Sequence, residues 1–245
     1  VFWIGKALWQ QEKYEEALGV FLESVEKYGR ERDALGVDLI LDEWVGRSRK
    51  LDEKQVLDAW NVLVAMHQRA KEAGEDALRL RLARAFLYRP GQGEGYKDDM
   101  LDILVQKENI PHASGAVLEL IMEEAKRCGR DDLALLAARE IVKVFTETDY
   151  VIGARLLLGS RAAEQGNLKE AKKHFDVIIT QFASTQSAGQ ALMTLGRAYF
   201  DKNDLEEADD CFKRILDVRE WKGALWPEAL FMRGECLRIQ GRYRK

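Results

Sequence analysis

Proline, cysteine, histidine and long apolar runs are all scarce in this sequence of 245 residues. Only three prolines occur, while Ala, Leu, Glu, Lys and Arg are abundant, and this composition favours helices. No apolar run is long enough to span a bilayer, so no membrane insertion is predicted for this segment. The net charge of −4 lacks the basic excess that is typical of nucleic-acid binders, so no nucleic-acid partner is predicted.

The residues that usually carry catalysis or hold metals are few and scattered. The three histidines show no HExxH motif and no pair one helical turn apart, and the odd number of cysteines shows no metal-type spacing. We therefore expect surface or packed imidazoles and unpaired thiols packed like small apolar groups. These residues are His67, His112 and His174, and Cys128, Cys211 and Cys236. No catalytic residue, metal or cofactor is predicted.

Two further stretches invite a functional reading. The glycine-rich "GQGEG" at 91–95 lacks the preceding strand and the following Lys-Ser/Thr of a phosphate-binding loop, so we expect a plain turn between helices. In "RLRLARAFLYR" the arginines spread around a helical wheel, so we expect a solvated helix surface. Of the six tryptophans we expect burial between helices, except at Trp9, which is expected in a groove.

Four stretches of the chain share one internal spacing. The stretches "LLLGSRAAEQGNLKEAKKHF" (156–175) and "TLGRAYFDKNDLEEADDCF" (194–212) are offset by 37 residues at every shared position. The same spacing recurs in "IGKALWQQEKYEEALGVF" near the start and in "RGECLRIQGRY" near the end. A repeat of this length indicates a solenoid of helix pairs. The mid-helix Gly159 and Gly196 then mark close helix contacts, and Asn167 and Asp204 are predicted N-caps.

The pattern resembles the tetratricopeptide repeat, whose signature is a Leu-Gly, a Tyr, an Ala and a Phe at fixed intervals and a final Pro, which is absent here. The resemblance implies an all-α, right-handed superhelix of about six helix pairs and a partial seventh. The stretch "FDVIITQFASTQSAGQALMTLGRAYF" is also similar in style to bacterial repeats of envelope-assembly lipoproteins and Tol-Pal-associated periplasmic proteins. A bacterial cell-envelope or periplasmic location is therefore expected, with the cytoplasm as the alternative.

We expect a single array over residues 1–245, as a segment of a longer protein, because the chain starts without Met and in a helical pattern. Regular copies of the motif are assigned to 1–30, 152–222 and 227–245, and degenerate helix pairs to 31–151. Within the degenerate region, the predicted pairs are 33–50 with 53–73 (with Asp52 as N-cap), 75–89 with 96–108, and 112–128 with 131–147. The total is about thirteen helices.

In the family that this sequence resembles, the first helix of each pair lines a concave groove that holds a peptide or helix. The groove sites lie one, four and five residues after the motif glycine. Carried over to this sequence, the groove residues are Lys6, Trp9, Gln10, Ser160, Ala163, Glu164, Arg197, Phe200, Asp201, Glu235, Arg238 and Ile239. The mixture of aromatic and charged groups suits a partner with apolar and charged anchors.

The favoured hypothesis is a non-catalytic scaffold that binds a protein or peptide partner. Two alternatives remain open at the level of sequence. One is an accessory or regulatory domain of a larger enzyme, and the other is a structural, self-assembling spacer. The oligomeric state is not predicted.

Overall fold

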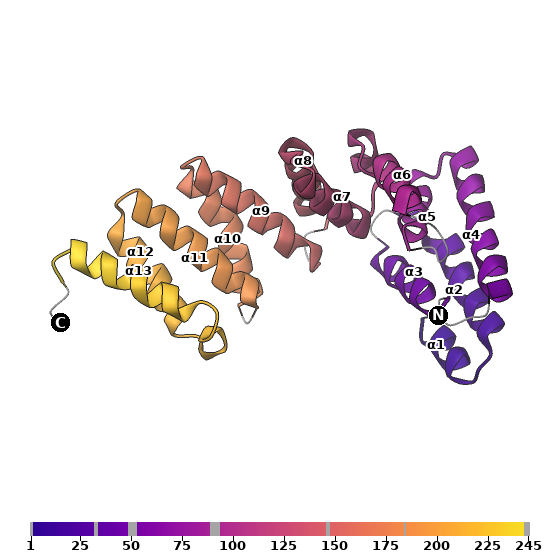
Figure 1. Cartoon of the computed structure of the whole chain (residues 1–245), viewed down its shortest axis with the longest axis horizontal. Helices are drawn as coiled ribbons and strands as arrows, with labels where there is room; N and C mark the ends of the chain where they lie inside the picture. The colour runs from indigo at the N-terminus through magenta and orange to yellow at the C-terminus, as the bar shows by residue number, and fades with distance from the viewer. Residues whose placement is uncertain are drawn as a thin grey trace. The chain divides into compact units, whose positions relative to one another are not determined.

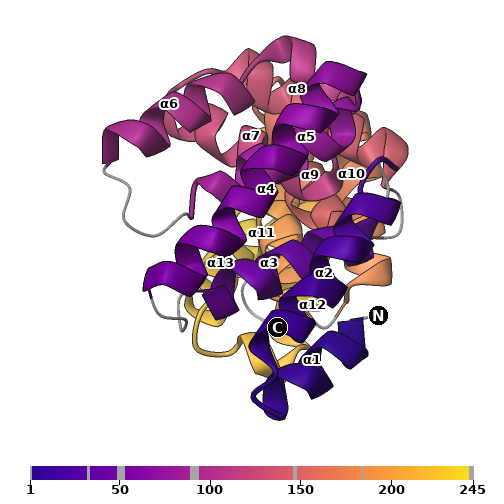
Figure 2. The ribbon, with the colours of Figure 1, turned by 90° about the vertical axis from the view of Figure 1, so that its right-hand side faces the viewer.

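A computed structural model describes residues 2–31, 34–48, 53–88, 94–145, 148–183 and 185–242. Every regular element in these ranges is a helix, as predicted (Figures 1 and 2). The α-helices are α1 (Phe2–Gln10), α2 (Tyr14–Tyr28), α3 (Leu35–Ser48), α4 (Glu53–Ala73), α5 (Asp76–Phe86), α6 (Glu94–Leu104), α7 (Gly115–Arg127), α8 (Asp131–Val144), α9 (Tyr150–Glu164), α10 (Leu168–Gln181), α11 (Gln186–Asp201), α12 (Leu205–Leu216) and α13 (Trp226–Ile239). Two 3₁₀ helices accompany them, η1 (Lys107–His112) and η2 (Arg219–Trp221).

The chain divides into two compact units, unit 1 (Val1–Thr146) and unit 2 (Glu147–Lys245). Unit 1 contains α1–α8 and unit 2 contains α9–α13. Within unit 2, each helix contacts the next one along the chain, and α11 also contacts both α9 and α13 (Figure 1). The first helices of successive pairs therefore lie next to one another in this unit. The single array over residues 1–245 stays a prediction.

The thirteen α-helices of the described residues agree with the predicted number, and the bounds of α4 are those predicted. The helix predicted over 96–108 instead ends at Leu104, and η1 follows it. Pro111 lies inside η1, where its missing N–H disfavours a continuing α-helix. The helix predicted over 112–128 begins only at Gly115, with Ser114 as its N-cap.

The two predicted N-caps in unit 2 differ in their hydrogen bonds. Asn167 caps α10 as predicted, because its side-chain oxygen accepts a hydrogen bond from the Glu170 amide at 3.2 Å. Asp204 is the N-cap residue of α12, as predicted, but its side chain makes no cap hydrogen bond, although its backbone dihedrals are close to those of Asn167. The two positions therefore differ in side-chain direction rather than in backbone. The predicted cap Asp52 lies outside the described residues.

One type of turn recurs between paired helices. Its central residue has a left-handed conformation, with φ between 60° and 73°. The next amide donates to the carbonyl five residues earlier at 2.8–3.0 Å, which closes the end of the first helix. The central residues are Glu12, Gly74, Gly129, Gly166, Asn203 and Gly241. This turn joins α1 to α2, α4 to α5, α7 to α8, α9 to α10 and α11 to α12, and it also follows α13.

The turn at Gly74 shifts one hairpin relative to the predicted pairing. The sequence pattern paired 33–50 with 53–73, whereas the turn joins α4 to α5, and these helices contact each other. Gly129 follows Gly74 by 55 residues, because α6 and η1 lie between them, while the later turns follow at intervals of 37 or 38 residues. The extra elements of unit 1 therefore lie between hairpins.

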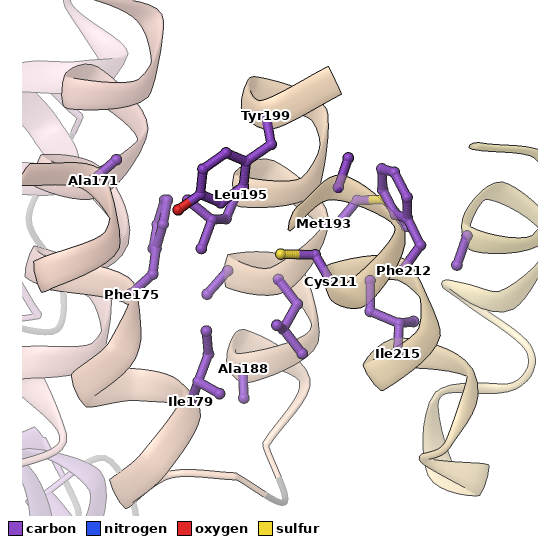
Figure 3. Close-up of a cluster of buried hydrophobic side chains, with 14 of the residues drawn as sticks. Ala171, Phe175, Ile179, Ala188, Met193, Leu195, Tyr199, Cys211, Phe212 and Ile215 are labelled. Carbon is purple, nitrogen blue, oxygen red and sulfur yellow. The ribbon is translucent and has the colours of Figure 1, made fainter. Parts of the chain in front are cut away.

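The motif glycines mark close contacts between paired helices, as predicted. A Cβ atom on Gly159 would lie 2.5 Å from Cε1 of Phe175, and one on Gly196 would lie 2.7 Å from Cε1 of Phe212. Gly5 faces Phe21 in the same way, at 2.3 Å. Figure 3 shows the rings of Phe175 and Phe212 on either side of α11, in the buried apolar cluster of unit 2. Each ring thus occupies the space that the missing side chain leaves.

Two hairpins of unit 1 are closed by the same turn but have different residues at the two positions that hold Gly and Phe in the other hairpins. Counted from the turn at Gly129, the motif-glycine position of α7 is occupied by Met122, and the Phe position of α8 by Ala138. Both residues are buried. In the hairpin α4/α5 the same two positions hold His67 and Ala83. The larger side chain therefore comes from the first helix, and the second helix supplies the small one.

A fully buried ion pair lies in the middle of unit 1. The guanidinium of Arg81 (α5) donates from Nε to Oδ1 of Asp38 (α3) at 3.1 Å, and both side chains are at most 1% exposed. Arg81 also donates to the backbone carbonyl of Gly29 at 2.7 Å, and to those of Glu31 and Ala34 in the connection between α2 and α3. Ser114 Oγ donates to the same Asp38 oxygen at 3.2 Å.

The prediction of a solvated arginine surface is therefore wrong for Arg81. It is nearly so for Arg84, whose side chain is 14% exposed and pairs with Asp42. Arg79 is partly exposed, and Arg89 lies outside the described residues. The physical reason is the turn at Gly74, which directs this face of α5 toward α3, where two aspartates one helical turn apart receive it.

The other composition-based predictions have mixed outcomes. Cys211 and Cys236 are buried, and burial raises the pKa of the Cys211 thiol to about 12, whereas Cys128 is exposed. Trp44, Trp60 and Trp221 are buried as predicted, but Trp3 is 76% exposed. Within the described ranges, no helix combines the length and the apolar character needed to cross a membrane.

Candidate partner-binding surfaces

The groove residues predicted on α1 lie beside α3 in unit 1. Lys6 Nζ is 3.7 Å from Oε2 of Glu43, and Arg47 Nε donates to Oε1 of the same carboxylate at 2.5 Å. The Arg47 guanidinium lies 5.0 Å from the ring centre of Trp9, a cation–π contact. Trp9 also packs 4.7 Å from the ring of Tyr14. This group of side chains is a surface of alternating charge and aromatic area, which we call the α1–α3 surface.

Trp9 contributes to the fold and to this surface at once. It is half-buried and packs against the apolar core of unit 1, while its outer part stays accessible. Lys6 is also half-buried, and Gln10 is exposed. A half-buried tryptophan held by an arginine and a tyrosine is a rigid apolar contact for a partner, because little conformational freedom is left to lose on binding.

The predicted residues of unit 2 lie on three neighbouring first helices. Arg197 of α11 donates from Nε to Oε1 of Glu228 on α13 at 2.7 Å, which links these two helices at the surface. The ion pairs that the other predicted residues form lie within one helix, Arg161 with Glu164 on α9 and Arg238 with Glu235 on α13. The hydrogen bond from Arg238 lowers the pKa of the Glu235 carboxyl, which favours its charged form.

The exposure of the predicted residues in unit 2 varies. Glu164, Arg197, Asp201, Arg238 and Ile239 are exposed, while Ser160, Ala163, Phe200 and Glu235 are half-buried. Phe200 and Ala163 also pack against the apolar core of unit 2, so part of each is already occupied. The structure brings the sets on α9, α11 and α13 onto neighbouring helices, and it places the set on α1 in the other unit.

An open hollow of about 740 Å³ lies on α13 and is lined by Leu230, Phe231, Gly234, Glu235 and Arg238. We call these residues the α13 face. Two of them were predicted as groove residues, but the two exposed apolar ones were not. Positions 230 and 231 follow the buried Leu192 and Met193 of α11 by one repeat, so the repeat register alone would predict that they are buried.

Arg155 and His174 form a polar site that the sequence pattern also missed. Burial lowers the pKa of both groups, and Glu170 lies 3.3 Å from Nε2 of His174. Arg155 Nε and His174 Nδ1 are buried atoms with no hydrogen-bond partner. The residue one repeat after Arg155 is the buried Leu192. A charged residue at a position that is apolar in the next repeat was therefore the sign in the sequence that could have revealed this polar site.

Among the described residues, no group of three or more His, Cys, Asp or Glu side chains is placed to hold a metal ion. The predicted residues on α1, α9, α11 and α13 offer aromatic rings, guanidinium groups and carboxylates, which are side chains common in protein interfaces.

A family model described as tetratricopeptide repeat matches residues 156–224 and, in an overlapping second match, residues 193–245. Residues 156–245 belong to the tetratricopeptide repeat superfamily. The resemblance seen in the sequence is thus confirmed for unit 2, whose hairpins carry the Gly–Phe contacts. Tetratricopeptide repeats generally mediate protein–protein interactions, and their helical fold is typically non-catalytic.

The chain also shows similarity to a solved structure, the crystal structure of BtubC (BKLC) from P. vanneervenii. The sequence identity is 15%, the TM-score is 0.46, and the match covers 84% of each chain. A similarity of this size does not assign a function to the tetratricopeptide repeats of the present chain. No functionally curated protein matches the chain.

Proposed function

We propose that this protein is a scaffold without catalytic activity of its own, and that it binds a peptide or helix at the predicted groove residues of its first helices. The observation that carries the proposal is that accessible aromatic and charged side chains occupy the predicted positions within each unit, on α1 beside α3 in unit 1 and on α9, α11 and α13 in unit 2. Trp9 with Arg47 in unit 1 and Arg197 with Asp201 in unit 2 are the principal examples. A rigid aromatic surrounded by ion pairs is typical of the anchor positions of protein interfaces.

The proposed binding residues are those predicted from the sequence, namely Lys6, Trp9, Gln10, Ser160, Glu164, Arg197, Phe200, Asp201, Glu235 and Arg238. The exposed charges set the selectivity, because like-charged partners are repelled and opposite charges accelerate association. The half-buried aromatics Trp9 and Phe200 supply apolar area. The bacterial cell envelope stays the proposed location, on the similarity of style in residues 175–200.

The proposal is tested by selecting a phage-displayed library of random peptides for binding to the purified 245-residue chain. We expect selected peptides to lose about tenfold or more in affinity when Trp9 is replaced by Ala, because a tryptophan anchor carries a large share of binding free energy. Arg197→Glu is expected to weaken binding in unit 2, since it reverses a charge on the proposed surface. Affinities are measured by titration calorimetry, and helicity by circular dichroism.

Trp3→Ala is the matched control, because Trp3 is more exposed than Trp9 and lies two residues before the motif glycine, outside the proposed set. Binding of the selected peptides that is indifferent to both Trp9→Ala and Arg197→Glu, in folded variants, would rule out the predicted groove residues as the binding site. A specific turnover catalysed by the purified chain would contradict a purely binding role.

A further inference from the structure

The connection between α12 and α13 is longer than the connection one repeat earlier. It comprises residues 217–225 and contains η2, whereas residues 182–185 are enough to join α10 to α11. The shorter connection contains no charged residue, while the longer one contains four. Both connections lead from the second helix of one pair to the first helix of the next, so the added length and charge are not required for stacking.

Four cations lie close together in the sequence at this junction. Two are in the last turn of α12, and two are in η2 or directly after it. The last turn of α10 contains no basic residue, so the repeat does not need cations there to complement the end of its second helix. All four side chains are exposed, and we call them the junction patch: Lys213, Arg214, Arg219 and Lys222.

Trp226, the first residue of α13, connects the two halves of the junction patch. Its indole N–H donates to the backbone carbonyls of Ile215 and Val218, both at 3.1 Å, which places the ring against the end of α12. Lys222 Nζ lies 5.6 Å from the centre of a ring of the same indole, a cation–π contact. The Lys222 amide donates to the Arg219 carbonyl at 3.1 Å. The cations of the connection therefore lie beside the last turn of α12.

Two apolar side chains anchor this connection on α11. Trp221 is buried, and a Cβ atom on Gly189 would lie 3.1 Å from its indole and 2.4 Å from Cδ1 of Leu225. The two side chains thus occupy the space that the glycine leaves. A connection that is held in this way loses little conformational freedom when a partner binds to it.

The junction patch differs from other charged surface of unit 2 in its lack of ion pairs. Among the described residues, no carboxylate forms an ion pair with any of its four cations. With Asp217 and Glu220, residues 213–222 contain four cations and two carboxylates, a net charge of +2 in a chain of net charge −4. Six other cations of unit 2 do pair with carboxylates of the same unit: Arg161, Lys172, Lys173, Arg197, Arg233 and Arg238.

We propose that the junction patch binds an acidic segment of a partner protein, whose Asp or Glu side chains pair with its four cations. Charge complementarity carries the proposal, because the positive charge of the patch is not neutralised within the folded unit. The guanidinium groups of Arg214 and Arg219 are each able to donate two parallel hydrogen bonds to one carboxylate. The half-buried ring of Trp226 adds apolar area beside Lys222.

The two carboxylates within the stretch favour a protein over other anionic partners. A nucleic acid or an anionic lipid surface presents a dense array of phosphates, which Asp217 and Glu220 repel. A peptide is able to place its carboxylates only where the cations lie. The patch contains none of the predicted groove residues, so it adds a second contact to the binding function proposed above.

The probe for this site is fluorescein-labelled octaglutamate, which is titrated with the 245-residue chain while its anisotropy is measured. We expect saturable binding that weakens as salt is added, because exposed charges are screened. The double variant Arg219→Gln/Lys222→Gln is expected to weaken binding about threefold to tenfold, since it removes two exposed charge contacts.

Lys169→Gln/Lys202→Gln is the matched control. It removes the same charge from the same unit, and both lysines are exposed and form no ion pair among the described residues. We expect the control to leave octaglutamate binding unchanged. Circular dichroism checks that both double variants fold, which is expected because all four substituted side chains are exposed.

Three results would overturn the proposal. The first is the absence of saturable binding. The second is equal weakening by the two double variants, which would show a general attraction to the charge of unit 2. The third is tighter binding of phosphatidylserine vesicles or of a single-stranded oligonucleotide that only Arg219→Gln/Lys222→Gln weakens, which would assign the patch to that partner. None of these results bears on Trp9 or Arg197, so the two proposals fail separately.

Discussion

The hairpins of unit 2 and those in the middle of unit 1 fill the contact between paired helices from opposite sides. In α9/α10 and α11/α12 the first helix has a glycine and the second a phenylalanine, and in α7/α8 the corresponding residues are Met122 and Ala138. The turn that joins the helices is the same in all three hairpins. The comparison shows that the turn and the combined volume of the two side chains at these positions are kept. Which of the two helices supplies the larger side chain differs between the hairpins.

The two units also differ in the polarity of the side chains that they bury. The core of unit 2 is an apolar cluster in which His174 is the one polar side chain among the described residues that is classed as buried. Unit 1 contains the buried Arg81–Asp38 pair, which links α5, α3, the α2–α3 connection and the start of α7. Burial raises the pKa of Asp38, against the opposing effect of Arg81 and Arg84. Unit 1 therefore holds its extra helices with a polar centre that unit 2 does not need.

The largest effect in this comparison is expected for Arg81→Leu in unit 1. Removing one member of a buried ion pair costs about 3–5 kcal/mol, and the carbonyls that Arg81 satisfies lose their donor as well. Arg69→Ala is the control, because Arg69 is 62% exposed and its ion pair with Glu26 contributes little. Urea unfolding followed by tryptophan fluorescence measures both variants. A loss for Arg81→Leu as small as that of the control would show that the buried pair does not organise unit 1.

The next effect is expected for Phe212→Ala in unit 2, which removes a fully buried ring and costs about 3–5 kcal/mol. Gly196→Met alone is expected to cost about 1–3 kcal/mol by overpacking against that ring. The double variant recreates the volume distribution of Met122 and Ala138, so its free energy of unfolding is expected to exceed the additive value. Hydrogen exchange of the α12 amides measures the loss in unit 2. Strict additivity would contradict the compensation inferred from the two units.

The smallest effect is expected for the reverse exchange in α7/α8. Ala138→Phe places a ring where Met122 already fills the space, at a cost of about 1–3 kcal/mol. Adding Met122→Gly makes room for the ring and is expected to recover part of the loss, less the helix cost of glycine of about 1 kcal/mol. Hydrogen exchange of the α8 amides is the measurement. Failure of Met122→Gly to recover any stability would show that the two positions do not face each other.

The sequence predicts the helical class, the number of helices and the Gly–Phe contacts, because these depend on local composition and on a repeated spacing. It does not reveal the hairpin α7/α8 as a copy of the motif, since Met122 and Ala138 conceal it from a search for Gly and Phe. The left-handed Gly129 was the more reliable sign, because a turn residue is constrained by backbone geometry rather than by volume.

The candidate sites likewise include residues that the repeated spacing predicts and residues whose environment depends on distant parts of the chain. Trp9 and Arg197 could be placed on first helices from the spacing alone, and they lie there. The burial of Arg81 could not be predicted, because its partner Asp38 is 43 residues away and a helical wheel shows only the residues of one helix. The exposure of Phe231 was equally hidden, since it depends on which helix covers α13 rather than on the sequence of α13 itself.

The common turn has a consequence for how such a chain changes over evolutionary time. Each hairpin closes through its own backbone bond, so a whole hairpin can be gained, lost or exchanged without altering the closure of its neighbours. Extra segments such as α6 and η1 are tolerated at the joints between these modules, where no closing bond is interrupted. Lineages of this protein are therefore expected to differ in length at those joints, and to conserve the short polar link inside each module.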